Sequence, residues 1–103
     1  MVIKSKTDML IDRVKNWGEQ KGLNNPQAQL NKCLEEFGEI AHEITRNNYD
    51  TPEMKDAIGD TMVTLIILSD ILGLDPVECL DSAYNEIKGR KGKTIKGMFI
   101  KNV

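Results

Sequence analysis

The sequence predicts an all-α fold, an antiparallel four-helix-type bundle followed by a short extended C-terminal tail. A capping residue precedes proline at three places, Asn25-Pro26, Thr51-Pro52 and Asp75-Pro76, and this is how many helices begin. Apolar residues between these points recur at helical spacing, and strand-like patterns are rare before the tail "TIKGMFIKNV". The connections are short, which favours antiparallel neighbours.

Local residues delimit each predicted helix. Ser5 can cap the first helix, and Gly22 follows its end. Gly73 ends the third helix, and glycines at 89 and 92 break the fourth. We therefore expect helices over about residues 5–21, 26–46, 52–72 and 76–88, with an extended segment after them.

Length and composition indicate one small domain. A chain of 103 residues buries a thin core, and oligomerisation would supplement it. Cys33 and Cys79 lack a CxxC spacing, so we expect reduced core thiols in a cytoplasmic protein. No stretch resembles a signal peptide or is apolar for long enough to span a membrane. The expectation is a single domain over residues 1–103, without a membrane partner.

Charge is distributed unevenly along the chain. Residues 1–86 hold 16 acidic and 8 basic residues, a balance of −8, whereas residues 87–103 hold 6 basic residues and no acidic ones. An acidic body with a basic tail can bind nucleic acid. It can equally hold a small anion next to a cation site.

The second predicted helix crowds four glutamates into nine positions: Glu35, Glu36, Glu39 and Glu43. At about 100° per residue they lie opposite the helix's apolar side. Like charges three and four residues apart repel each other. Taken alone, this pattern is typical of a solvated helix face.

The third predicted helix favours a different interpretation. Apolar residues point nearly all round it, so we expect it to be central and buried. Asp56 and Asp60 lie four residues apart on a line with Ile67, and burying unpaired carboxylates costs several kcal/mol each. A divalent cation shared with the facing glutamates would offset this cost. Oxygen ligands without histidine indicate Mg²⁺, with Mn²⁺ as the alternative, rather than zinc or a di-iron centre.

Two acidic motifs and a C-terminal segment also mark a resemblance. "EEFGE" (residues 35–39) is followed after sixteen residues by "DAIGD" (residues 56–60), and the chain closes with "AYNEIKGRKGKTIKGMFIK". Over about residues 10–101 the sequence resembles the MazG-like all-α nucleoside triphosphate pyrophosphohydrolases, whose hallmark is EExxE followed by ExxD. One position departs: the family's glutamate would fall on Ala57, and Asp56 is the nearest substitute.

The resemblance implies an enzyme that assembles as a homodimer or homotetramer. It would split a (deoxy)nucleoside triphosphate into monophosphate and pyrophosphate by attack of water on the α-phosphorus. The implied Mg²⁺ ligands are Glu36, Glu39, Asp60 and, as the substitute, Asp56. Glu35 would either complete the ligand set or orient and deprotonate the water.

Six further residues are candidates for substrate binding. Lys32 could contact a phosphate or pair with Glu36 four residues away. Trp17 could stack on a nucleobase or simply pack half-buried. The remaining four lie near the C-terminal end of the fourth helix, where the cations would clamp the triphosphate or sit as solvated charges favourable to the helix dipole; they are Asn85, which could bond a phosphate or sugar, Lys88, Arg90 and Lys91.

Two functional hypotheses follow. The first is a Mg²⁺-dependent nucleotide pyrophosphohydrolase acting on (deoxy)nucleoside triphosphates, without a nucleic-acid ligand. The alternative is a non-catalytic helical protein that binds a nucleotide, a nucleic acid or a protein partner through its basic tail, residues 87–103. The enzyme requires Glu39, whereas the tail binder requires the tail lysines.

Overall fold

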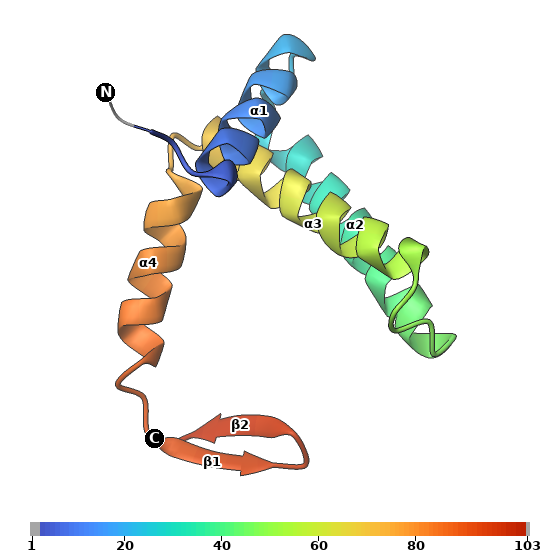
Figure 1. The fold of residues 1–103 in the computed structure, drawn as a ribbon, viewed down its shortest axis with the longest axis vertical. Helices are drawn as coiled ribbons and strands as arrows, with labels where there is room; N and C mark the ends of the chain where they lie inside the picture. Colours follow the sequence, from blue (N-terminus) through green and yellow to red (C-terminus); the bar gives the residue numbers. More distant parts are fainter. Residues whose placement is uncertain (1–2, 103) are drawn as a thin grey trace.

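The computed structural model describes residues 3–102, which form four helices and a two-stranded sheet (Figure 1). Their bounds are α1 (Lys6–Gln20), α2 (Pro26–Thr45), α3 (Pro52–Ile71), α4 (Pro76–Ile87), β1 (Gly92–Ile95) and β2 (Met98–Lys101). The four predicted helices are confirmed to within one or two residues at each end.

Every helix begins at a polar residue whose side-chain oxygen accepts a backbone N–H of the first turn. These caps are Ser5, Asn25, Thr51 and Asp75. Proline follows in α2, α3 and α4, where its missing N–H costs nothing. The left-handed residues Gly22, Asn47 and Gly73 follow α1, α2 and α3, with φ of 71°, 57° and 73°, as is common just beyond a helix end. Local chemistry therefore explains why the boundaries were predictable.

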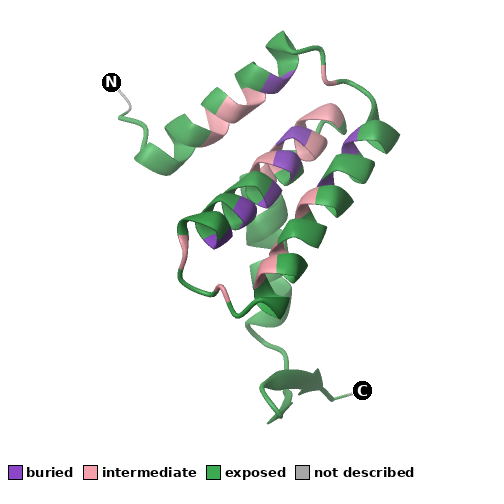
Figure 2. Ribbon diagram, turned by 90° about the vertical axis from the view of Figure 1, so that its right-hand side faces the viewer, coloured by how far each residue is buried: buried purple, intermediate pink, exposed green. Residues whose placement is uncertain are grey.

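The helices α2 and α3 form an antiparallel pair that contains most of the core (Figure 2). The buried residues of the pair are Gln29, Cys33, Met54, Ala57, Thr61, Thr64 and Ile67. The two threonine hydroxyls donate to carbonyls of their own helix, from Thr61 to Ala57 at 2.8 Å and from Thr64 to Thr61 at 2.7 Å. This core is small, because none of the large side chains in the described range is fully buried.

The helix α1 packs against α3 at a point where the two backbones come close. Gly18 is the buried residue of α1, and a Cβ placed on it would lie 3.2 Å from Cγ1 of Ile67. A glycine here lets α1 approach the core, which closes one side of the α2–α3 pair.

The helix α4 leaves the other three helices instead of completing a four-helix bundle within one chain. It is bent by 103° from α3 and touches only α3, and the sheet touches no other element in the described range (Figure 1). The radius of gyration is 16.3 Å, against about 13 Å for a compact domain of this length. The residues described here thus form a three-helix body with an extended arm, consisting of α4 and the sheet.

The extended tail predicted from the sequence is a β-hairpin. Its strands pair antiparallel in a register that sets Gly92 opposite Lys101 and Ile95 opposite Met98. Lys96 and Gly97 both have positive φ, 51° and 77°, as in the two-residue turns that match strand twist. A Lys-Gly pair is not the usual Asn-Gly turn signal, so the sequence did not predict the turn.

Burial within the chain differs from the prediction in two helices. Only one face of α3 is buried, and Asp56 and Asp60 are exposed rather than held in the core. Cys33 is buried as predicted, but Cys79 on α4 is exposed. Cys79 is exposed because α4 does not cover the body of its own chain, whereas the two aspartates lie beside the buried stripe of α3 rather than on it. No single helix of residues 3–102 is long and apolar enough to cross a membrane. The bent pair α3–α4, taken together, has the length and apolar composition of a membrane span.

Candidate functional site: an acidic pocket beside an amide-lined pocket

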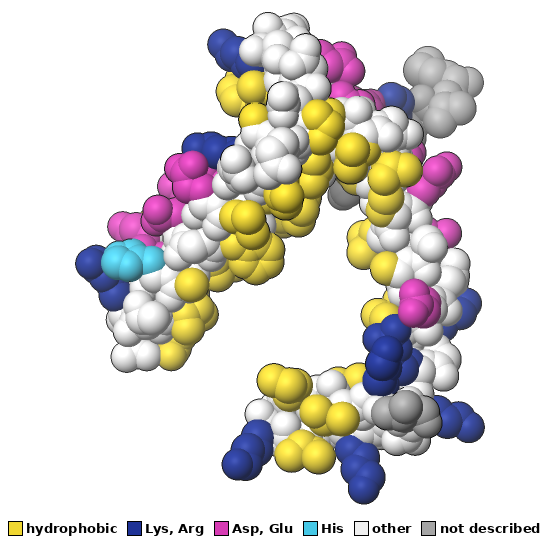
Figure 3. Space-filling view, turned by 180° about the vertical axis from the view of Figure 1, so that it is seen from behind, with side chains coloured by type: hydrophobic (Ala, Val, Ile, Leu, Met, Phe, Trp, Pro, Cys, Tyr) yellow, Lys and Arg dark blue, Asp and Glu magenta, His cyan; other side chains and the backbone are white. Residues whose placement is uncertain are grey.

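The α2–α3 pair has two chemically opposite edges. On each helix, the acidic residues and the exposed apolar residues lie on opposite sides of the buried stripe. Because the helices are antiparallel, the acidic sides meet along one edge of the pair and the apolar sides meet along the other. Figure 3 shows acidic side chains along one flank of this body and apolar ones along the other.

The acidic edge is hollowed into a pocket of about 390 Å³. Seven carboxylates and one alanine line this acidic pocket: Glu35, Glu36, Glu39, Glu43, Glu53, Asp56, Ala57 and Asp60. It therefore brings together all five acids that the sequence singled out, from two facing helices. It adds Glu43, which the sequence grouped with the crowded glutamates, and Glu53 from the first turn of α3.

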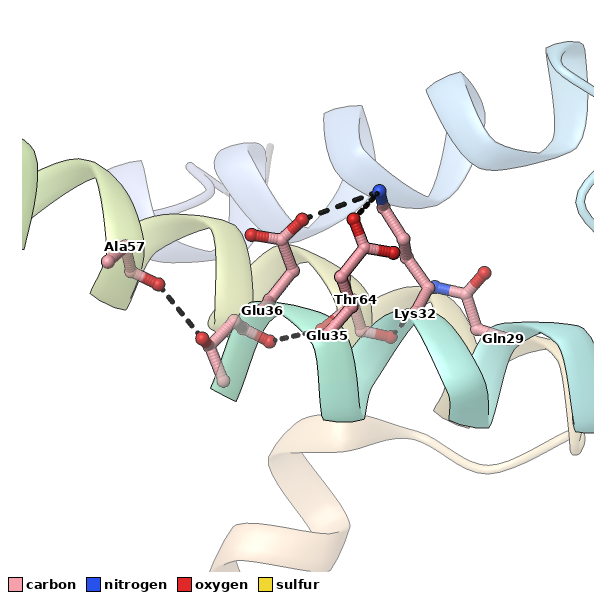
Figure 4. Close-up of polar contacts among 7 residues, drawn as sticks. Gln29, Lys32, Glu35, Glu36, Ala57 and Thr64 are labelled. Atoms are coloured by element: carbon pink, nitrogen blue, oxygen red, sulfur yellow. Dashed lines mark hydrogen bonds and ion pairs between the residues drawn. The ribbon is translucent and has the colours of Figure 1, made fainter. Parts of the chain in front are cut away.

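Lys32 is the cation nearest to this cluster. Its ammonium lies 3.2 Å from Oε1 of Glu35 and 3.5 Å from Oε1 of Glu36 (Figure 4). The hydrogen bond with Glu35 and the charge of that carboxylate raise the pKa of Lys32, so the ammonium stays charged at neutral pH. Among residues 3–102, no basic group pairs with Glu39, Asp56 or Asp60.

The donor set of the acidic pocket suits a hard divalent cation. All its charged ligand atoms are carboxylate oxygens, which Mg²⁺ and Ca²⁺ prefer. No three acidic, histidine or cysteine side chains in the described part of the chain lie close enough to share one ion. Carboxylates of like charge repel each other, and a bound cation would have to draw these side chains together.

The structure also bears on the position where the sequence departs from the ExxD pattern. Ala57 is only 5% exposed and lines the acidic pocket, and so does its neighbour Asp56. Asp56 thus lines the same pocket as Asp60.

A second pocket of about 580 Å³ adjoins the acidic one and shares Glu36 and Asp60 with it. We call it the amide pocket, because three side-chain amides, Asn24, Asn25 and Gln29, lie in its wall. Its other lining residues are Trp17, Gly22, Leu23, Ala28, Lys32, Val63, Thr64 and Ile67. Trp17 is 49% exposed, so its ring is available to a ligand in this pocket.

Four predicted substrate-binding residues lie elsewhere. Asn85 is on α4, and Lys88, Arg90 and Lys91 follow it; none of them lines either pocket of the same chain. Arg90 pairs instead with Glu86 at 3.0 Å. A contact between these residues and a ligand in the acidic pocket stays a prediction, and it would require the arm of another copy.

Sequence reasoning missed Gln29, which is buried between α2 and α3 and lines the amide pocket. Its signal was a polar residue four positions before the buried Cys33 on the same helix face. That spacing places it on the inner face of α2.

Comparison with known proteins identifies the fold. The crystal structure of the Bacillus-conserved MazG protein, a nucleotide pyrophosphohydrolase, superposes with a TM-score of 0.71, covering 88% of this chain and 97% of that one at 24% identity. The chain therefore has the all-α fold of that MazG protein.

In sequence, the chain is 37% identical over 71 residues to an uncharacterized 18.2 kDa protein encoded in the rep-hol intergenic region of Haemophilus phage HP1 (strain HP1c1). The match covers 66% of this chain but only 42% of the phage protein, so the chain spans less than half the length of this relative. No family model matches the chain.

Proposed function

We propose that the protein is a Mg²⁺-dependent nucleotide pyrophosphohydrolase, which cleaves a (deoxy)nucleoside triphosphate into monophosphate and pyrophosphate. The observation that carries this proposal is the acidic pocket between α2 and α3, which adjoins a less charged pocket large enough for a nucleoside. The shared fold with a MazG nucleotide pyrophosphohydrolase supports it. A triphosphate needs cations, whereas a nucleoside needs an aromatic and amide-lined surface.

In this proposal the acidic pocket holds the reacting phosphates through metal. Glu36, Glu39, Asp56 and Asp60 would hold the Mg²⁺, and this ion would neutralise phosphate charge and lower the pKa of a water. Glu35 is the more exposed of the two carboxylates paired with Lys32, at 64% against 15% for Glu36. It is thus free to complete the ligand set or to accept a proton from the attacking water.

The chain's own residues orient the substrate on either side of this centre. Lys32 lies in the amide pocket, beside carboxylates of the acidic one. It can release its contact to Glu35 and donate to a phosphate oxygen. Trp17 offers its ring to the nucleobase.

A second copy of the chain completes the particle in this proposal, as a homodimer or homotetramer. Eight large apolar residues on the apolar edge of α2–α3 are exposed: Leu30, Leu34, Phe37, Ile44, Ile58, Met62, Leu65 and Leu72. Figure 3 shows apolar side chains of α4 and the hairpin facing this edge across an open gap. Exposed apolar surface of this extent is characteristic of association, and an isolated hairpin is marginal in water. The arm's Lys88, Arg90 and Lys91 would then approach the acidic pocket of a neighbour.

The test is pyrophosphate release from a panel of canonical and modified (d)NTPs, with Mg²⁺ and with EDTA. Metal-dependent release, with the matching monophosphate as second product, is the expected result. Absence of release from every nucleotide, with folded protein and saturating metal, would rule the hydrolase out. Salt-dependent retention of DNA or RNA by the basic tail would then favour the non-catalytic alternative.

A further inference from the structure

Gln29 is a buried polar side chain whose amide has a fixed orientation. It is 6% exposed, and its Nε2 donates to the backbone carbonyl of Thr64 at 3.1 Å, across the α2–α3 interface (Figure 4). A carbonyl can only accept, so the amide nitrogen must face Thr64. The amide oxygen, Oε1, is therefore directed away from this contact.

This oxygen is an acceptor without a protein donor. No group among residues 3–102 donates a hydrogen bond to it. Every fully buried side-chain nitrogen or oxygen in that range has a partner, so Oε1 is not fully buried. The oxygen must therefore be reached from outside, and Gln29 lines the amide pocket. An acceptor nearly removed from water gains from a ligand N–H and is penalised when none is offered.

The position of Gln29 matches one end of a nucleotide. Along α2, Lys32 lies about one turn beyond it and Glu36 about two turns, a rise of about 10.5 Å. Carboxylates, a cation and a buried acceptor thus follow one another along one helix. A nucleotide bound in this direction would present its phosphates to the carboxylate-bound metal and to Lys32, and the far edge of its base to Gln29.

We propose that Gln29 is a specificity-determining residue: its Oε1 accepts a hydrogen bond from an N–H on the edge of the substrate base. The substrates are then bases that carry an amino group or an imide N–H at that edge, and analogues lacking that N–H are rejected. This inference rests on the proposed function, because it takes the acidic pocket as the place of the phosphates.

The test uses Trp17, the chain's one tryptophan, which lines the same pocket. Its fluorescence is titrated with matched nucleosides: cytidine against 2-pyrimidinone riboside, adenosine against purine riboside, and uridine against 3-methyluridine. We expect at least one parent to bind about 10- to 100-fold more tightly than its analogue. Equal affinity within every pair, or no quenching by any nucleoside at millimolar concentration, would overturn the inference.

The matched variants are Gln29→Met and Gln27→Met. Gln27 is exposed on the same helix and bonds only Asn31, at 3.2 Å. We expect Gln29→Met to bind the favoured parent as weakly as its analogue, whereas Gln27→Met keeps the discrimination. Discrimination that survives in Gln29→Met would contradict the proposal.

A measurement on the unchanged protein covers the case in which Gln29→Met does not fold. The side-chain amide resonances of the three glutamines, Gln20, Gln27 and Gln29, are followed by NMR during the titration. Only that of Gln29 should shift strongly, and an unshifted Gln29 would overturn the inference. Pyrophosphate release without discrimination would refute the role of Gln29 alone, whereas discrimination without release would refute the hydrolase alone.

Discussion

Four glutamates share one side of α2, and their mutual repulsion lowers the stability of this helix. Glu39 lies four residues from both Glu35 and Glu43 and three from Glu36, so it is the most crowded of the four. Each like-charge pair at this spacing costs about 0.2–0.5 kcal/mol. All four line the acidic pocket, and in the proposed function a bound cation would offset their repulsion.

Glu39→Gln separates function from stability. It removes a charge from the proposed metal site while keeping size and shape, so we expect pyrophosphate release to fall by about 100-fold or more. Unfolding in urea should show unchanged or higher stability, by up to about 1 kcal/mol, because repulsion is relieved. Glu78→Gln, on α4 away from both pockets, is the control and should keep full activity. Full activity in Glu39→Gln would exclude the acidic pocket as the catalytic site.

Lys32→Met tests whether this lysine serves the substrate. Its two partners hold it at the pockets' boundary, and losing a charged hydrogen bond to phosphate should lower kcat/KM by about 10- to 100-fold. The raised pKa of Lys32 means that the ion pairs form fully below its ordinary value of 10.5 and are lost as the pH rises through the higher folded value. Exposed ion pairs contribute little to stability. The melting temperature of Lys32→Met should therefore be close to that of the unchanged protein. Lys55→Met, on α3 outside both pockets, is the control. An equal loss of kcat/KM in Lys55→Met would show that Lys32 has no specific role in substrate binding.

At the level of residues, the sequence predicted the acidic cluster because charge and helical spacing are local properties. It missed Gln29 because a glutamine on a helix is usually a surface residue. The available signal was its spacing of four residues from Cys33, and the structure shows Gln29 buried and bonded to Thr64 on another helix. The prediction that Asp56 and Asp60 share a buried stripe was wrong, because the buried stripe of α3 includes Ala57, Thr61 and Thr64, and the aspartates lie beside it on the acidic edge.

At the level of elements, local signals determined where helices begin and end, but not how the helices are oriented relative to one another. Cap and proline pairs gave the starts of α2, α3 and α4. The direction of α4 depends on contacts between residues far apart in sequence, which periodicity does not report. The hairpin depends on a turn at Lys96 and Gly97. Lys96 has a positive φ, which is uncommon for residues other than glycine, asparagine and aspartate.

Two glycines in helix interiors should respond oppositely to alanine. A Cβ at Gly38 on α2 would meet nothing within 4 Å, so Gly38→Ala should raise the free energy of unfolding by about 1 kcal/mol. A Cβ at Gly18 would lie 3.2 Å from the buried Ile67, which cannot move freely. We expect Gly18→Ala to be less stable than Gly38→Ala by about 1 kcal/mol or more. Urea denaturation of both variants decides this, and equal stabilisation would show that α1 is not packed closely on α3.

At the level of the whole molecule, the chain described here is open and its own core is small. Its radius of gyration exceeds that of a compact domain, and every residue of the hairpin is exposed. The apolar edge of α2–α3 and the side of the arm that faces it both carry apolar side chains (Figure 3). A second copy placed in the gap would bury both, which accounts for the apolar residues that periodicity assigned to the core.

Leu80→Glu and Leu34→Glu test this assembly from its two sides. Leu80 on α4 is 71% exposed and Leu34 on α2 is 62% exposed, so neither substitution should harm an isolated chain by more than a few tenths of a kcal/mol. If the arm of one copy packs on the apolar edge of another, each glutamate is forced into an apolar interface and weakens association strongly. Sedimentation velocity should show a dimer or tetramer for the unchanged protein and monomers for both variants. Asn16→Glu on α1, which adds the same charge at an exposed site, should stay assembled. Both leucine variants sedimenting like the unchanged protein would show that these two surfaces do not meet.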